Sequence, residues 1–322
     1  ERGEVMKKTW YLIIGVVLLV IGCIAYGYHE HHKPKTAQEL KTVRVAYLPI
    51  THALPVFATK ELETADGPVH VELVKYGSWP ELMDALNTGK VDAASVLVEL
   101  GVKAREQGID VRAAALGHTE GNIIIVNKDI NSVQDLKGKS FAIPHKQSTQ
   151  KILVDLMLEK AGLTEKDVQI VEMSPPEMPS ALAVGQIAGY SVAEPFGSLA
   201  LEMGTGKVFE DPDHLWHDNI CCALVFNGQF VDEHHDLAKA FTKAYLDAGT
   251  YLDEHPKAQE EISSKYMKFN DSVIERSLKV IGFKDLALTE DRYNALVHHM
   301  THIDLIKKVP SYSEFVDTSL LP

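Results

Sequence analysis

Two adjacent cysteines and fifteen histidines are the residues of this sequence whose side chains most readily bind metals or react. His298 and His302 are four residues apart, which places both imidazoles on one face of a predicted helix in a spacing compatible with zinc. The cysteines and histidines form no closed tetrahedral framework in the sequence, so we expect no cofactor and no metal ligand, with zinc as an alternative. Adjacent cysteines rarely bridge each other, and two small buried strand residues are the simplest interpretation of Cys221 and Cys222.

Enzyme signatures are missing from the sequence. It contains neither G-x-S-x-G nor H-E-x-x-H, and no Ser-His-Asp set can be defended from sequence. The segment 204–207, Gly-Thr-Gly-Lys, lacks the spacing of a P-loop and is predicted to be a turn. We therefore predict a binding protein without catalytic residues.

Polar loops that follow predicted strands are the other candidate sites. Ligands of open α/β sheets bind at the carboxyl ends of strands and at helix N-termini, where free N–H groups favour an anion. Each loop could also be an ordinary cap or turn, but we expect at least two of them to contact a ligand. The candidates are Thr51, His52, His118, Ser148, Thr149, Gln150 and Glu194.

A repeated pattern indicates the elements that position these loops. Residues 81–96 and 177–192 match at one constant offset, and an alternating apolar run precedes each copy. Each copy predicts a strand, a short helix, a glycine stop and a second strand. Two similar α/β units suggest two lobes with a ligand cleft between them.

Length and composition fit two ordinary globular lobes. The chain has 322 residues, 45% of them hydrophobic, and a net charge of −13, which makes nucleic acid an unfavourable partner. Strands alternating with helices predict an α/β fold with mixed sheets flanked by helices, and the chain after Asp236 is predicted to be mostly helical. We place lobe one at 42–126 plus 219–322 and lobe two at 127–218, with crossings near Asn127 and Asn219.

The N-terminal segment has the pattern of an export signal. Two lysines precede a short apolar stretch, which ends in Val20-Ile21-Gly22-Cys23 and resembles the lipobox of bacterial lipoproteins. We predict a lipoprotein signal or anchor over 1–23 with lipidation at Cys23, and a solvated tether over 24–41. An uncleaved membrane anchor is the alternative. In both cases the folded part lies on the outer face of the cytoplasmic membrane, in the periplasm or outside the cell.

An ordered series of motifs covers nearly all of the chain after this segment. The segments 47–55, 77–79, 121–122, 175–178 and 190–196 together resemble the nitrate/sulfonate/taurine-type substrate-binding lipoproteins of ABC importers. The resemblance implies a periplasmic-binding-protein type II clamshell, permease and ATPase partners, and a small solute, expected to be anionic (a sulfonate, taurine or nitrate). It implies ligand contacts at Thr51, Trp79, Asn122, Ser148 and Glu194. Gly121, which precedes Asn122 in the same turn, is a further candidate contact.

Two departures from the nitrate and bicarbonate members affect the expected solute. Gln150 stands where those members have a histidine at a helix start, and the segment 219–222 offers no lysine for their later charged contact. A sulfonate or a neutral heterocycle is therefore at least as plausible as nitrate.

Other functions remain open from the sequence. Cys221-Cys222 is similar to part of the cysteine-rich motif of thiamine-pyrimidine proteins on the same fold, so Cys221 joins the candidate ligand contacts. A thiamine-pyrimidine-precursor binding protein, a synthase-like enzyme and an extracellular sensor domain are the alternatives. We expect a monomer that binds a small molecule.

Overall fold

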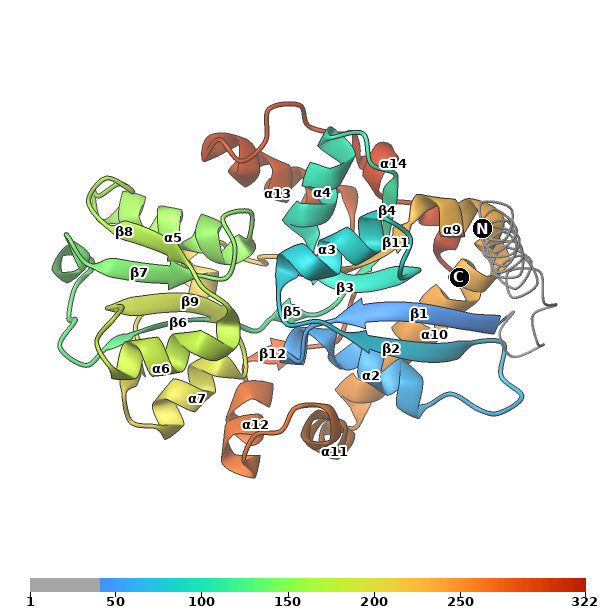
Figure 1. Cartoon of the computed structure of the whole chain (residues 1–322), viewed down its shortest axis with the longest axis horizontal. Helices are drawn as coiled ribbons and strands as arrows, with labels where there is room; N and C mark the ends of the chain where they lie inside the picture. The colour runs from blue at the N-terminus through green and yellow to red at the C-terminus, as the bar shows by residue number, and fades with distance from the viewer. Residues whose placement is uncertain (1–40) are drawn as a thin grey trace, which may run out of the picture. The chain divides into compact units, whose positions relative to one another are not determined.

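The computed structural model describes residues 41–322, and Thr42–Pro322 forms one compact unit (Figure 1). The predicted signal or anchor segment with Cys23, and all of the predicted tether except its last residue, lie outside the described residues. Within the part that the structure describes, no helix has the length and apolar character needed to cross a membrane.

The first of two five-stranded sheets has the order β2-β1-β3-β11-β4. Strand β1 pairs parallel with β2 and β3, whereas β11 comes from much later in the chain and pairs antiparallel with β3 and β4. Both β3 and β11 are buried along their whole length, as expected for central strands covered by helices. The strands are β1 (Thr42–Tyr47), β2 (His70–Lys75), β3 (Ala93–Leu97), β4 (Val111–Leu116) and β11 (Cys222–Asn227).

The second sheet, at the left of Figure 1, has the order β10-β6-β9-β7-β8. Strand β7 pairs parallel with β8 and β9, and β6 pairs antiparallel with β9 and β10. The predicted class, mixed sheets flanked by helices, is confirmed. The strands are β6 (Asn122–Asn127), β7 (Ser140–Ile143), β8 (Gln169–Glu172), β9 (Gly189–Ala193) and β10 (Gly206–Val208), with helices α5 (Thr149–Lys160), α6 (Met178–Ala183) and α7 (Phe196–Glu202).

The chain passes between the two sheets twice. It leaves β4 at Leu116 and enters β6 at Asn122, a few residues before the crossing predicted at Asn127. It returns between Val208 and Cys222, through the short helix α8 (Pro212–Leu215). A two-stranded pair, β5 (Thr119–Glu120) with β12 (Ile281–Gly282), lies at the first crossing.

The repeat predicted from the sequence is present in the structure. Helix α3 (Trp79–Asn87) follows β2 and leads into β3, as α6 follows β8 and leads into β9. Gly89 and Gly185 end the two helical segments with φ of 69° and 73°, a left-handed conformation that favours glycine. The repeated leucines, Leu86 and Leu182, are both buried.

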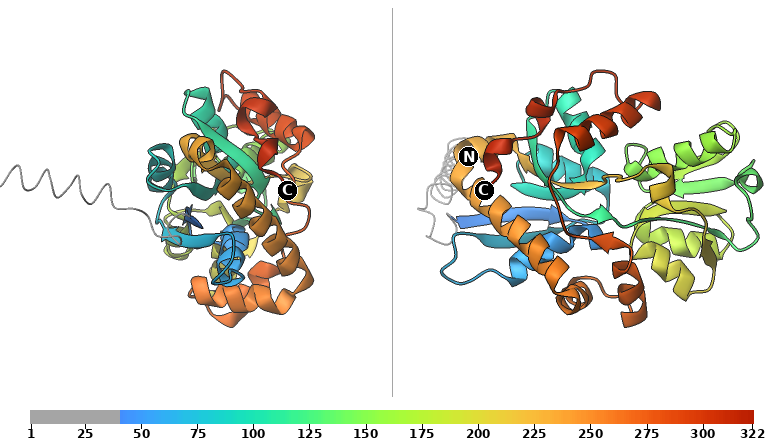
Figure 2. Two further views of the ribbon diagram at one scale, coloured as in Figure 1. Left: turned by 90° about the vertical axis from the view of Figure 1, so that its right-hand side faces the viewer. Right: turned by 180° about the vertical axis from the view of Figure 1, so that it is seen from behind.

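The C-terminal third is mostly helical, as predicted. Its longest helix, α10 (His235–Glu254), crosses the back of the first sheet in Figure 2 and packs against α2 (Leu54–Glu61). Helix α4 (Val98–Glu106) lies on the other face with α3 (Figure 1). The remaining helices are α9 (Gly228–Glu233), α11 (Pro256–Tyr266), α12 (Asp271–Leu278), α13 (Glu290–His302) and α14 (Tyr312–Phe315).

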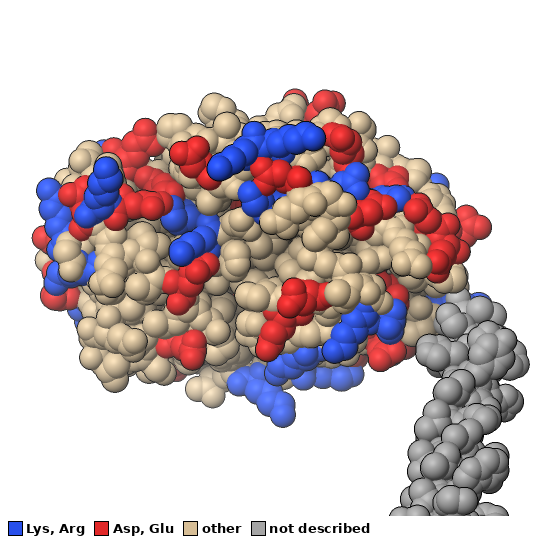
Figure 3. All heavy atoms as spheres, turned by 45° about the horizontal axis from the view of Figure 1, so that its top comes forward, with Lys and Arg blue, Asp and Glu red and all other residues tan. Residues whose placement is uncertain are grey.

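Charged side chains of both signs are interspersed on the face shown in Figure 3. Charged side chains of the described residues also pair locally; Arg112, for example, contacts Asp110 at 2.8 Å and Asp232 at 2.9 Å. The negative net charge is therefore not gathered into one patch on that face.

Candidate metal centre and ligand cleft

The edge of the first sheet that faces the second sheet collects the ends of several strands. Strand β1 ends there and is followed by the 3-10 turn Thr51–Ala53, which carries His52. Strand β4 also ends there and leads to His118. Because β11 runs antiparallel to β4, its first residues lie at the same edge, with Ala223 opposite Leu116.

Four metal-binding side chains meet at this edge: His52, His118, Cys221 and Cys222. Their donor atoms all lie within 4.8 Å of one another, and each side chain is at most 1% exposed. The two Sγ atoms are 3.9 Å apart, and Cys222 Sγ is 3.5 Å from His52 Nδ1. A tetrahedral zinc site with ordinary bond lengths separates its donors by about 3.3–3.8 Å, so small shifts of these side chains would bring all four donors to the distances of a Cys2His2 metal site.

Backbone carbonyls orient both imidazoles toward the centre of the cluster. His52 Nε2 lies 2.9 Å from the carbonyl oxygen of Gly121, and His118 Nδ1 lies 2.7 Å from that of Glu120. When each of these nitrogens donates its hydrogen, the lone pairs of His52 Nδ1 and His118 Nε2 face the cluster, where Nδ1 lies 3.5 Å from Cys222 Sγ and Nε2 accepts a long hydrogen bond of 3.4 Å from the Cys222 N–H. A hydrogen bond from the other ring nitrogen to a backbone carbonyl is typical of metal-bound histidines.

Burial and mutual contacts shift the pKa values of three members of the cluster when no metal is bound. Burial and the neighbouring His52 lower the pKa of His118 to about 4, so this imidazole is neutral at pH 7. Burial opposes ionisation of both thiols, but contacts with Cys222 and the histidines lower the pKa of Cys221 well below its usual value. Burial and the charge of Cys221 raise the pKa of Cys222. A divalent cation would offset the cost of ionising the second thiol.

Polar side chains from the second sheet cover the cluster. Gln150 Nε2 donates to Asn122 Oδ1 at 2.7 Å and lies 3.4 Å from Cys221 Sγ. Asn122 in turn donates to Asn219 Oδ1 at 3.1 Å. Thr51 donates to the carbonyl oxygen of Glu194 through both its N–H and its hydroxyl. These contacts connect the two sheets directly beside the four donors.

Glu99 is a fully buried carboxyl group in the first turn of α4. Its Oε1 bonds with Thr149 Oγ1, which also lies 2.7 Å from the carbonyl oxygen of Ile220. Burial and the neighbouring Cys221 raise the pKa of Glu99 well above its usual value. A protonated Glu99 satisfies both contacts, because it donates to Thr149 while Thr149 donates to Ile220.

Replacing Glu99 by Gln is expected to stabilise the metal-free protein increasingly as pH rises. The folded-state pKa of Glu99 lies above its unfolded value, so its stabilising contribution is present at low pH and is lost as pH rises. The gain in unfolding free energy from Glu99→Gln should grow by up to about 1.4 kcal/mol per pH unit above about pH 5. Urea unfolding between about pH 5 and pH 8 measures it; parallel pH profiles for the two proteins would contradict the burial argument.

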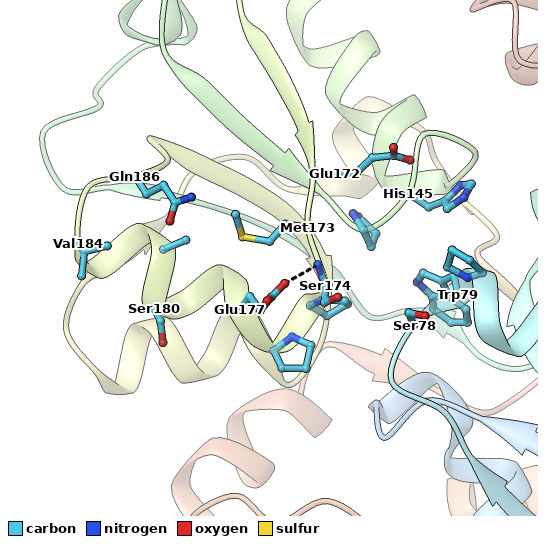
Figure 4. Close-up of a pocket in the computed structure, with 15 residues that line it drawn as sticks. Ser78, Trp79, His145, Glu172, Met173, Ser174, Glu177, Ser180, Val184 and Gln186 are labelled. Carbon is cyan, nitrogen blue, oxygen red and sulfur yellow. Dashed lines mark hydrogen bonds between the residues drawn. The ribbon is translucent and has the colours of Figure 1, made fainter.

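A cavity of about 860 Å³ lies where the start of α3 faces the second sheet (Figure 4). Ser78 and Trp79 line one side, and His145, Glu172 and the turn around Ser174 line the other. The Trp79 side chain is buried, and its Nε1–H has no hydrogen-bond partner among the described residues. A solute atom that accepts a hydrogen bond would satisfy this group.

The structure separates the predicted site residues into three groups and one helix cap. The metal cluster and its cover contain His52, His118, Gly121, Asn122, Thr149, Gln150 and Cys221; Thr51 and Glu194 form the neighbouring contact between sheets; Trp79 lines the cavity. Ser148 caps α5 by accepting a hydrogen bond from the Lys151 N–H, so its role in the structure is that of a helix cap. His302, from the zinc-compatible pair, instead contacts Glu159 at 3.1 Å.

Cys222 is the cluster member that sequence reasoning did not select. The interpretation of a buried strand residue is right for its position, since it begins β11 and is fully buried. The other candidates were selected because they follow strands that end at one edge of a sheet. The first residue of an antiparallel strand lies at that same edge, so the rule applies to Cys222 as well.

Adding a methyl group at Gly117 is expected to disturb the cluster. A Cβ there would lie 2.9 Å from the carbonyl oxygen of His52 and 3.5 Å from Cys222 Cβ, so the His52 backbone must move away. We expect Gly117→Ala to weaken zinc binding by about 10–100-fold, as displaced supporting contacts do at other metal sites. Zinc titration against a competing chelator measures the change. Gly77→Ala, where a Cβ meets nothing within 4 Å, should bind as the unsubstituted protein does, and equal affinities for the two variants would contradict the prediction.

Comparison with known proteins identifies the family of the chain. Residues 36–266, more than half of the sequence, match the NMT1-like family. The chain belongs to the NMT1-like family. This NMT1-like chain is 35% identical, with a TM-score of 0.83, to the ligand-binding component of an ABC-type import system from Staphylococcus aureus, solved with zinc bound. That match covers 87% of this chain and 97% of the other.

Two further relatives of this NMT1-like protein are linked to nitrate by name. The periplasmic nitrate-binding protein NrtA from Synechocystis has the same fold, with a TM-score of 0.78 at 18% identity and 88% coverage of both chains. The nitrate import ATP-binding protein NrtC from Synechocystis is 25% identical over 239 residues, 67% of this chain. The chain spans 36% of the length of NrtC. The family and the periplasmic-binding-protein fold implied by the motifs are thus confirmed.

Proposed function

We propose that this protein is the solute-binding component of an ABC-type importer and that it binds zinc at His52, His118, Cys221 and Cys222. The observation that carries the proposal is the convergence of these four buried donors at the edge between the two sheets. Two thiolates and two imidazoles are a donor set that zinc favours. The zinc-bound relative from Staphylococcus aureus supports zinc for this chain.

The buried groups around the cluster that could face a ligand include two carboxyl groups, Glu99 and Glu194. Both residues are at most 1% exposed. Lys151, a buried basic residue of α5, contacts Asp155 and Glu165, so its charge is already compensated. A nitrate or sulfonate ion in contact with Glu99 would meet a carboxyl group in place of a basic side chain.

A small anionic solute in the cavity of Figure 4 is the second candidate. The Trp79 Nε1–H, which has no partner among the described residues, offers a donor to a sulfonate, taurine or nitrate oxygen. The nitrate-binding protein NrtA and the nitrate import ATP-binding protein NrtC support this solute class. If the solute binds in this cavity, zinc is a permanently bound ion at the neighbouring cluster. One protein can then contain both sites.

The proposal includes an anchored binding protein of the kind predicted from the sequence. Residues 1–23 direct export, Cys23 carries the lipid, and 24–41 tether the folded part to the outer face of the cytoplasmic membrane. The lobes, 42–126 plus 219–322 and 127–218, close on the solute as a monomer and present it to permease and ATPase subunits. No bond of the solute is made or broken, so the protein is not an enzyme.

Metal analysis of the purified protein tests the proposal. Protein loaded with zinc under reducing conditions and then dialysed is expected to retain about one zinc per chain. A parallel thermal-shift screen with nitrate, taurine and alkanesulfonates tests the second candidate, since a ligand at 100 times its Kd stabilises by about 2.7 kcal/mol. Retention of no zinc would contradict the metal proposal. A rise in the unfolding temperature with an anion, and none with zinc, would favour the second candidate.

A further inference from the structure

The two copies of the sequence repeat share their core positions and differ on their surface. At the constant offset between the copies, the buried residues stay the same, as Leu86 and Leu182 do. Three exposed positions change, and two of them lose a charge. The exposed pairs are Asp84 and Ser180, Thr88 and Val184, and Lys90 and Gln186. Since all six side chains are exposed, packing of the core does not explain the difference.

The lost charges belong to a longer segment with few charged residues. Residues 173–206 contain three glutamates and no lysine or arginine, although 24% of the whole chain is charged. Glu194 is buried, and Glu202 contacts Arg276 at 3.4 Å. Glu177 is exposed and forms no ion pair with a basic side chain of the described residues. The surface of this segment is therefore nearly uncharged, with Glu177 as its unpaired carboxylate.

The three exposed residues of the second copy line one end of the cavity in Figure 4. Ser180, Val184 and Gln186 lie on and just after α6, at the end opposite Trp79. Val184 is a large apolar residue that is 78% exposed, and Thr88 shows that the matching helix end accepts a polar residue. Depletion of charge is typical of the core of a protein–protein interface. The α6 end of the cavity therefore has the composition of a docking surface.

We propose that the α6 end of the cavity is the docking surface for the permease subunit of the importer. The cavity begins where α3 faces the second sheet, so a permease segment seated along α6 lies beside the region from which a solute leaves. The partner segment is apolar and carries a basic side chain that pairs with Glu177. The end at Trp79 stays available to a solute. The proposal rests on the proposed importer function and adds the surface through which it acts.

Exchange of surface residues between the two copies tests the proposal. The variant carries the first-copy residues in the second copy: Ser180→Asp, Val184→Thr and Gln186→Lys. It should fold and retain zinc, because the first copy accepts these residues at the same positions. We expect its Kd for the permease–ATPase complex of the same organism, held in nanodiscs, to rise at least tenfold, since charges now enter an apolar contact. Biolayer interferometry with zinc-loaded protein under reducing conditions measures the Kd.

The reverse exchange in the first copy is the matched control. It consists of Asp84→Ser, Thr88→Val and Lys90→Gln, and it should leave the Kd unchanged. A second pair separates charge from shape. Glu177→Gln keeps the side-chain contact at the helix start and removes the charge, so it should slow association and weaken its dependence on salt. Glu81→Gln, at the matching position of the first copy, should change neither.

The outcomes distinguish the docking surface from the importer function. Equal Kd values for the second-copy exchange variant and the unsubstituted protein would overturn the docking surface and leave the importer function intact. A dimer of the unsubstituted protein that the same exchange disperses in sedimentation would also overturn it, because the surface would then bind a second copy. Absence of any binding of the unsubstituted protein to the nanodisc complex would contradict the importer function and the docking surface together.

Discussion

A protein with serine at both positions 221 and 222 is expected to lose its stabilisation by zinc. The unsubstituted protein should gain about 2.7 kcal/mol of unfolding free energy at zinc concentrations 100 times the Kd. Cys221→Ser with Cys222→Ser leaves two imidazoles and two poorly ionised hydroxyls, which cannot replace thiolate ligands. Thermal unfolding with and without zinc, in the presence of a reductant, measures the gain.

The matched control for the cysteine pair is the histidine pair on α13. His298→Gln with His302→Gln removes the zinc-compatible spacing seen in the sequence, but these residues lie outside the cluster. This variant should keep the full zinc response. If it loses the response and the serine variant keeps it, the metal is bound at α13 and the cluster is not the site.

Phe226→Ala is expected to destabilise the protein by about 3–5 kcal/mol, because a large aromatic side chain leaves a cavity that the core cannot fill. Phe226 is fully buried in β11, with its ring centroid 6.0 Å from that of Phe241 and 6.2 Å from that of Phe230. The same strand begins at Cys222, so the strand that supports the cluster also depends on this packing. Urea unfolding of the metal-free protein measures the loss.

Val208→Ala provides the comparison for Phe226→Ala. Val208 lies on β10 and is 52% exposed, so its truncation should change the unfolding free energy by less than about 0.5 kcal/mol. A loss below about 1 kcal/mol for Phe226→Ala would show that β11 is not packed as the structure has it.

The fold could be predicted largely from local patterns. Alternating apolar runs predict β2 and β8. The repeated glycines, Gly89 and Gly185, predict the ends of the two helical segments, where both adopt a left-handed conformation. The position of the first crossing is difficult to predict from the sequence, because the continuous apolar strand β6 could belong to either sheet. Only its pairing with β9 and β10 assigns it to the second.

The metal cluster could be predicted only in part. The strand-end rule selected His52 and His118 separately, because each follows a predicted strand. It could not join them to Cys222, which is 170 residues from His52 in the sequence. That proximity depends on the insertion of β11 between β3 and β4, an arrangement that no local spacing encodes. The contact of Glu99 could not be predicted for the same reason, since its hydrogen-bond partner Thr149 lies on a helix of the other sheet.

X-ray absorption spectroscopy of the zinc-loaded protein tests the central claim most directly, because it reports the ligand atoms of the metal. The account predicts two sulfur ligands at about 2.3 Å and two nitrogen ligands at about 2.0–2.1 Å. The spectrum should lose its sulfur contribution in the Cys221→Ser, Cys222→Ser variant. A shell of oxygen and nitrogen ligands without sulfur in the unsubstituted protein would contradict the account.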